Sequence, residues 1–220
     1  MMAETTTSVR VRLTEVFFSL QGESSRIGLP TVFIRLTGCP LRCSWCDTPH
    51  SFTGGAWHSL EEILSELARH DTPYVCVTGG EPLAQKSCLP LLTALCDAGY
   101  QVSLETSGAL DISGTDPRVA RIMDLKAPGS GEVARNRWEN LEHLNERDEI
   151  KIVLASEADY LWAKEMIAKF RLDRLCEVLL SPVQGSLAPA SLAEWILRDH
   201  LNVRMQVQLH KIIWGNEPGR

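Results

Sequence analysis

Long hydrophobic runs are missing from this chain of 220 residues. A membrane helix needs about 20 consecutive apolar residues, so we expect no membrane-spanning segment. The polar residues 1–10 also lack the apolar region of a secretory signal peptide. Basic residues are fewer than acidic ones, and the formal net charge at pH 7 is −6. Broad nucleic-acid binding depends on phosphate neutralisation by Lys and Arg, so we expect no nucleic-acid partner.

We also expect no disulfide bonds. The chain has seven cysteines, an odd number, and three of them crowd into eight residues. Such spacing is poor disulfide geometry, so we expect a reducing, cytoplasmic environment. The isolated cysteines stand in apolar segments and are expected to be buried thiols: Cys76, Cys88, Cys96 and Cys176. The length and the apolar fraction of 44% predict a single domain over residues 1–220.

The crowded thiols, Cys39, Cys43 and Cys46, form a Cys-x3-Cys-x2-Cys pattern directly after the apolar residues 31–36. A loop this short can direct three sulfurs to one centre, but it supplies no obvious fourth ligand. Thiolates select zinc, copper(I) or iron–sulfur clusters. Closed structural zinc sites and closed cubane clusters each take four protein ligands. The pattern therefore favours a 4Fe-4S cluster with one iron open to a reacting ligand.

Two other interpretations of this pattern remain open from spacing alone. A zinc ion could be completed by a distant cysteine or histidine, and His50 and His58 are nearby in the sequence. The thiols could also act as a redox sensor.

Strand and helix patterns alternate along the chain. We expect strands at residues 11–18, 32–36, 74–78, 100–105, 121–125, 149–154, 177–180 and 204–209. Helices are expected at residues 60–70, 89–98, 135–145, 157–170 and 189–200, the first with Ser59 as cap and Glu62 as its reciprocal partner. About six such units indicate parallel β/α structure but are too few for a closed eight-unit barrel. The predicted fold is therefore α/β, an open partial (β/α)6 barrel.

Polar and glycine-rich motifs fall where these strands end: the cysteine loop, Thr78-Gly79-Gly80-Glu81, Glu105-Thr106-Ser107 and Lys126. In barrels of parallel strands, ligands bind at the carboxyl ends. A turn explains any one of these motifs but explains all of them together poorly. The two glycines also let backbone approach a ligand closely, because glycine has no Cβ. The motifs therefore predict one shared site.

The cysteine spacing together with Gly79-Gly80-Glu81-Pro82 resembles the radical S-adenosylmethionine superfamily. The resemblance implies a 4Fe-4S cluster on the three cysteines, with S-adenosylmethionine bound at the open iron. It also implies that cofactor contacts come from Trp45, Cys46, Asp47, Gly80, Glu105, Ser107, Asp124, Leu125 and Lys126, with Ser181 and Gln184 as weaker candidates.

Six segments narrow the resemblance to the 7-carboxy-7-deazaguanine synthase family: residues 18–23, 33–39, 46–48, 77–82, 104–108 and 208–211. Ser24 departs from the glycine that family members usually carry. The resemblance implies a carbon–nitrogen lyase on the route to 7-deazapurines such as queuosine. A 5′-deoxyadenosyl radical would remove hydrogen from 6-carboxy-5,6,7,8-tetrahydropterin, whose ring then contracts to 7-carboxy-7-deazaguanine with loss of ammonia.

The same resemblance implies substrate contacts from Leu20, Gln21, Gly22, Arg35 and Thr78, with Arg35 on the substrate carboxylate. Thr48 is the implied Mg²⁺ ligand, since this cation prefers oxygen. A homodimer and a flavodoxin or ferredoxin as electron donor are also implied. His210 and Lys211 could serve either the pocket or the edge of the last strand. Two alternatives remain, a glycyl-radical activating enzyme and a non-enzymatic zinc-binding protein.

Overall fold

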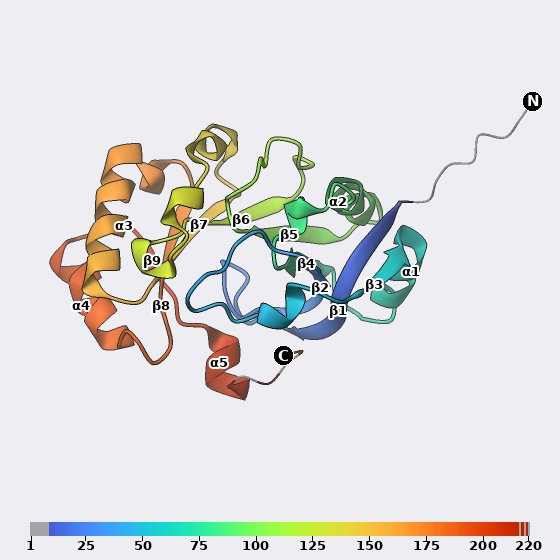
Figure 1. The fold of residues 1–220 in the computed structure, drawn as a ribbon, viewed down its shortest axis with the longest axis horizontal. Helices are drawn as coiled ribbons and strands as arrows, with labels where there is room; N and C mark the ends of the chain where they lie inside the picture. Colours follow the sequence, from blue (N-terminus) through green and yellow to red (C-terminus); the bar gives the residue numbers. More distant parts are fainter. Residues whose placement is uncertain (1–8, 216, 218, 220) are drawn as a thin grey trace, which may run out of the picture.

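The computed structural model describes residues 9–215, 217 and 219. They contain one nine-stranded sheet in the order β3-β1-β2-β4-β5-β6-β7-β8-β9 (Figure 1). β1 is antiparallel to its neighbours β2 and β3, whereas the other neighbouring strands run parallel. The strands are β1 (Arg10–Leu20), β2 (Pro30–Leu36), β3 (Ala56–Ser59), β4 (Tyr74–Gly79), β5 (Gln101–Thr106), β6 (Ala120–Asp124), β7 (Glu149–Leu154), β8 (Glu177–Pro182) and β9 (Arg204–Met205).

The sheet is open, because its edge strands β3 and β9 do not pair with each other in the described part of the chain. The predicted open partial barrel is thereby confirmed. The α-helices are α1 (Leu60–Leu67), α2 (Cys88–Asp97), α3 (Glu157–Phe170), α4 (Pro189–Arg198) and α5 (Leu209–Trp214). The predicted cap of α1 is present, with reciprocal bonds between Ser59 and Glu62. No helix among the described residues is long and apolar enough to cross a membrane.

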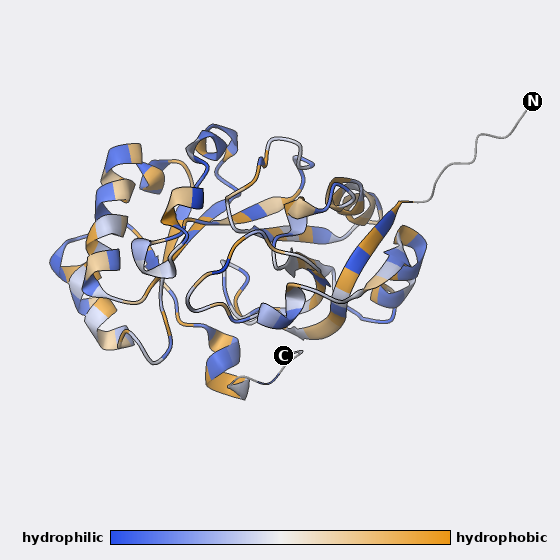
Figure 2. Cartoon of the chain, viewed as in Figure 1, coloured by the Kyte–Doolittle hydropathy of each residue, from blue (hydrophilic) through white to orange (hydrophobic). Residues whose placement is uncertain are grey.

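Hydrophilic and hydrophobic residues alternate along β1 (Figure 2), as expected where successive side chains point to opposite faces of a strand. On one face, the apolar side chains of β2, β4 and β5 pack against α1 and α2, and those of β6, β7 and β8 pack against α3 and α4. Each buried aliphatic side chain there contributes about 1.5–3 kcal/mol. The opposite face, here called the inner face, carries polar side chains that include Thr78, Glu105, Asp124, Lys151 and Ser181.

The predicted helix at residues 135–145 is wrong. This region contains only short 3-10 segments, Val133–Arg135 and Trp138–His143. Two asparagine side chains bond to backbone of other segments: Asn136 to the N–H and C=O of Lys126, and Asn140 to the carbonyls of Gly108 and Leu110. Such bonds compete with helix formation. Here they fix the segment to the backbone that follows β5 and β6.

The predicted strand at residues 204–209 is mostly wrong as well. Only Arg204–Met205 pair as β9, and Leu209 begins α5. The Gln206 side chain bonds to both backbone groups of Ser24, and the Leu209 N–H donates to the Gly22 carbonyl at 3.0 Å. These long-range contacts turn the chain away from the sheet edge.

Smaller differences concern single elements and residues. The strand pattern missed β3, and β1 continues through Leu20, two residues beyond the strand expected at residues 11–18. Cys96 is only partly buried, whereas the other three isolated cysteines are buried as predicted.

Ser24 has a left-handed backbone, with φ +68°, and its side chain is buried. This conformation costs an L-residue about 1–2 kcal/mol relative to glycine. We expect Ser24→Gly to be more stable than Ser24→Ala by about 1 kcal/mol. Both variants lose the hydroxyl that accepts the Arg26 N–H, so the pair isolates the backbone effect. Urea unfolding measures the difference, and equal stabilities would contradict the backbone assignment.

Candidate functional site at the strand ends

The cysteine loop leaves β2 and docks on the connection that follows β6. The Ser44 N–H donates to the Ser130 carbonyl at 3.0 Å, and the Arg42 N–H donates to Glu132 Oε1 at 2.5 Å. The three thiols of the loop are free and half-buried. A single loop, held by hydrogen bonds to the connection that follows β6, therefore carries all three sulfur donors.

The glycine motif after β4 lies against this loop. The Glu81 N–H donates to the Gly38 carbonyl at 2.8 Å. A Cβ at Gly80 would lie 2.5 Å from that carbonyl oxygen and 2.6 Å from the Cys39 Cβ. The Glu81 carboxylate is buried and accepts from Ser107 N at 2.6 Å and Thr106 Oγ1 at 2.9 Å. Glycine is thus required for the close approach, and Glu81 fixes the motif to the end of β5.

The cysteine side chains of this loop are suitable ligands for an iron–sulfur cluster. The three cysteine sulfurs are soft ligands on a loop that contacts the backbone of Gly80. Thiolate ligands of this kind favour iron–sulfur clusters. Burial raises the pKa of Cys43, and the Lys126 ammonium opposes that rise. Binding of metal would therefore displace thiol protons. Among the described residues, no three His, Cys, Asp or Glu side chains lie close enough together to hold a metal ion, and His50 lies 3.4 Å from Glu15 Oε1.

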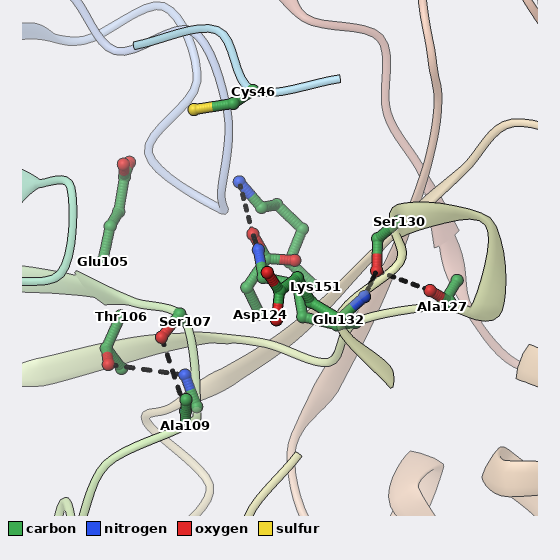
Figure 3. Close-up of polar contacts among 12 residues, drawn as sticks. Cys46, Glu105, Thr106, Ser107, Ala109, Asp124, Ala127, Ser130, Glu132 and Lys151 are labelled. Atoms are coloured by element: carbon green, nitrogen blue, oxygen red, sulfur yellow. Dashed lines mark hydrogen bonds and ion pairs between the residues drawn. The ribbon is translucent and has the colours of Figure 1, made fainter. Parts of the chain in front are cut away.

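Charged groups line the inner face below the loop. Asp124 Oδ2 lies 2.9 Å from the Lys126 ammonium and 3.8 Å from the Lys151 ammonium, and Figure 3 shows Asp124 and Lys151 close together, with Glu105 standing apart from them. Burial lowers the pKa of Lys126, but Asp124 and the Cys43 thiol more than reverse that effect. Within the part of the chain that the structure describes, Asp124 Oδ1 and Ser181 Oγ are buried without a hydrogen-bond partner. Both atoms remain available to a polar ligand.

A second group of polar residues joins β1, β4 and β5. Glu105 accepts a hydrogen bond from Thr78 Oγ1 at 3.0 Å and one from Gln21 Nε2 at 3.4 Å. The Glu105 carboxylate, which the family resemblance assigns to the cofactor, therefore orients two residues assigned to the substrate.

The end of the chain folds over the segment at residues 20–22. A Cβ at Gly22 would lie 2.2 Å from His210 Nδ1, so any larger residue there would require the imidazole ring to move. Gln208 Nε2 donates to Asp47 at 3.0 Å, and Lys211 forms an ion pair with the same carboxylate. Burial lowers the pKa of His210. These contacts place His210 and Lys211 at the site and not on a strand edge.

Comparison with known proteins supports one family. Residues 33–127 match the radical SAM superfamily model. The 7-carboxy-7-deazaguanine synthase of Chlorobaculum tepidum is 49% identical over 212 residues, which cover 95% of this chain and 96% of that protein. The synthase of Koribacter versatilis is 40% identical, covering 94% and 98%. The chain belongs to the 7-carboxy-7-deazaguanine synthase family.

A solved structure extends this family likeness to the fold. The crystal structure of QueE from Escherichia coli superposes with a TM-score of 0.73 at 27% identity, over 91% of this chain and 95% of that one. The match covers most of both chains, so the likeness concerns the fold as a whole.

Several residues implied by the synthase resemblance lie on the inner face or in the loops next to it. Thr48 Oγ1 lies 4.0 Å from the Cys46 sulfur, and half-buried Trp45 is part of the same loop. The inner-face and loop members of the set are Leu20, Gln21, Gly22, Thr78, Gly80, Glu105, Asp124, Lys126 and Ser181.

Four other implied residues have different surroundings. The Leu125 side chain lies in the core under α3, so only its backbone faces the site. Ser107 is held by Glu81, and Gln184 is exposed in the turn after β8. Arg35 Nε donates to Glu15 Oε1 at 2.6 Å; a substrate carboxylate would have to share or replace that partner.

Sequence reasoning assigned no role to Glu23, Glu81 or Lys151. Each is a buried charged residue whose partners come from distant segments. For Lys151 a signal exists, because a lysine stands between two isoleucines of β7. Its position on the inner face could have been inferred from the two-residue period of the strand.

Gly80→Ala is expected to prevent assembly of the cluster, because the added methyl collides with loop backbone that cannot rotate away. The measurement is iron and acid-labile sulfide content after anaerobic reconstitution. Gly114→Ala is the matched control, since its Cβ would meet only the flexible end of Leu89, at 3.1 Å. Normal iron loading of Gly80→Ala would show that the close approach is not needed.

Proposed function

We propose that this synthase-family chain converts 6-carboxy-5,6,7,8-tetrahydropterin to 7-carboxy-7-deazaguanine, with loss of ammonia, as a radical carbon–nitrogen lyase. The observation that carries the proposal is that the cysteine loop and the glycine motif meet at the carboxyl ends of β2 and β4, while Gln21 contacts Glu105 on the inner face of the same sheet. The family relationship supports the substrate class.

In this proposal Cys39, Cys43 and Cys46 hold the 4Fe-4S cluster. When bound, the cluster supplies the electron that starts radical chemistry on S-adenosylmethionine. The protein's own part is positioning and exclusion of water. Asp124 Oδ1 and Ser181 Oγ, which have no hydrogen-bond partner among the described residues, offer acceptor and donor capacity to the cofactor's polar groups.

The pterin is planar and rich in hydrogen-bonding groups, and the site can match that chemistry. Gln21 and Thr78 present an amide and a hydroxyl in orientations fixed by Glu105. Arg35 offers a guanidinium to the substrate carboxylate, with Glu15 as its partner in the absence of substrate. Thr48 would provide one oxygen to Mg²⁺, which keeps most of its waters.

The remaining expectations belong to the same proposal. Residues 1–220 would act as a single domain and assemble as a homodimer in the cytoplasm. Flavodoxin or ferredoxin would supply the electron.

Product analysis tests the proposal directly. The reconstituted, reduced protein is incubated with S-adenosylmethionine, Mg²⁺ and the carboxypterin, and the deazaguanine acid is sought by mass spectrometry. The expected result is product that depends on all three additions. Cleavage of S-adenosylmethionine without this product would favour a glycyl-radical activating enzyme instead.

A further inference from the structure

Lys151 lies on the inner face of β7, and neither the motif nor the family argument gives it a role. Its ammonium forms an ion pair with the Glu23 carboxylate and lies 3.8 Å from Asp124 Oδ2. The side chains of Lys151 and Glu23 are only 11% and 8% exposed. Lysine is almost never this buried unless its charge is paired, so the ammonium and the two carboxylates behave as one unit.

Glu23 connects this unit to the substrate segment. It directly follows residues 20–22, and its N–H donates to Gln21 Oε1 at 3.2 Å. Its Oε1 atom accepts a hydrogen bond from Gln208 Nε2 at 2.8 Å. The position of the Glu23 carboxylate therefore influences both the Gln21 amide and the end of the chain that packs on Gly22.

We propose that Lys151 is a positioning residue for the substrate: it holds Glu23 against β7 and thereby fixes residues 20–22 beside the inner face of the sheet. This inference rests on the proposed function, because it takes those residues as substrate contacts. Lys151 acts through Glu23 and does not itself touch the reacting atoms.

Lys151 also keeps Glu23 ionised. Burial raises the pKa of Glu23, but Lys151 and the bond from Gln208 outweigh burial and leave this pKa below its ordinary value. Without Lys151, burial dominates and the pKa of Glu23 rises. Glu23 is then neutral and remains buried at low pH, and it ionises and turns towards water as the pH rises. The other charged groups around the pair are Asp124 on β6, Glu105 on β5 and His210 in α5.

The test is substrate affinity without turnover. Reconstituted protein with S-adenosylmethionine and Mg²⁺, but no reductant, is equilibrated with the carboxypterin, and bound ligand is measured by dialysis. Lys151→Met is expected to weaken binding by about tenfold, because removing one partner leaves a buried charge uncompensated. Its affinity should fall further as pH rises through the raised pKa of Glu23. Lys151→Arg, which keeps the charge, should restore most of the affinity.

A double variant separates positioning from direct contact. In Glu23→Gln combined with Lys151→Met, no unpaired charge remains, so affinity should equal that of Glu23→Gln alone and the pH dependence should vanish. This comparison holds even where Lys151→Met alone folds poorly. Lys164→Met is the control. Lys164 lies on α3, away from the site, and its ammonium is 2.9 Å from the Asp199 carboxylate.

Two outcomes would overturn the inference: wild-type affinity with a flat pH profile in Lys151→Met, or losses that add in the double variant. A wild-type protein that binds no carboxypterin would overturn the proposed function, and this inference with it.

Discussion

Cys43→Ala is expected to abolish product formation while the fold stays intact. Cys43 lies on the loop after β2, is half-buried and belongs to neither apolar core cluster, so its loss should change the free energy of unfolding by less than about 1 kcal/mol. Two sulfurs cannot replace three in holding a cluster that already has one iron without a protein ligand. Activity should therefore fall below detection, and iron content should fall with it.

The matched control is Cys96→Ala. Cys96 is also a partly buried free thiol, but it lies in α2 on the outer side of the sheet. This variant should keep its iron and its activity. Turnover by Cys43→Ala at a rate near that of Cys96→Ala would remove the cluster from the proposed mechanism.

Glu81→Ala is expected to have the largest effect on stability. The carboxylate has no exposed surface, and it accepts bonds from Leu83 N, Thr106 Oγ1 and both donors of Ser107. Each buried donor that loses its acceptor costs about 1–3 kcal/mol. We expect a loss of about 3–5 kcal/mol in the free energy of unfolding, measured by urea denaturation.

Glu61→Ala provides the comparison, because Glu61 is exposed in the first turn of α1. Its effect should stay within about 0.5 kcal/mol. Glu81→Gln, which keeps the shape, should be intermediate, since an amide can accept from some of the same donors. If Glu81→Ala were as stable as Glu61→Ala, the hydrogen bonds described for Glu81 would not be important to the fold.

The parts of the fold that could be predicted from sequence are those set by local patterns. The apolar periodicity of residues 149–154 and the Ser59–Glu62 capping box depend on neighbours in the chain, and both are confirmed. The helix expected at residues 135–145 failed because Asn136 and Asn140 bond to segments far away in the sequence.

The candidate site divides in the same way. The cysteine loop and the glycine motif were predictable, because each carries its chemistry within a few residues. The pairing of Glu23 with Lys151 joins residues 128 positions apart, and the closure of α5 over Gly22 depends on the folded sheet. Such contacts leave no local signal, so only the structure reveals them.

The most direct measurement concerns the open coordination position. Anaerobically reconstituted protein is analysed for iron, sulfide and zinc, and the electron paramagnetic resonance spectrum of the reduced protein is recorded with and without S-adenosylmethionine. Three cysteine ligands predict about four irons and four sulfides per chain, and a spectrum that changes when S-adenosylmethionine binds. Colourless protein that contains zinc and no sulfide would contradict the assignment of a cluster with one open iron. A cluster spectrum that does not change when S-adenosylmethionine is added would also contradict it.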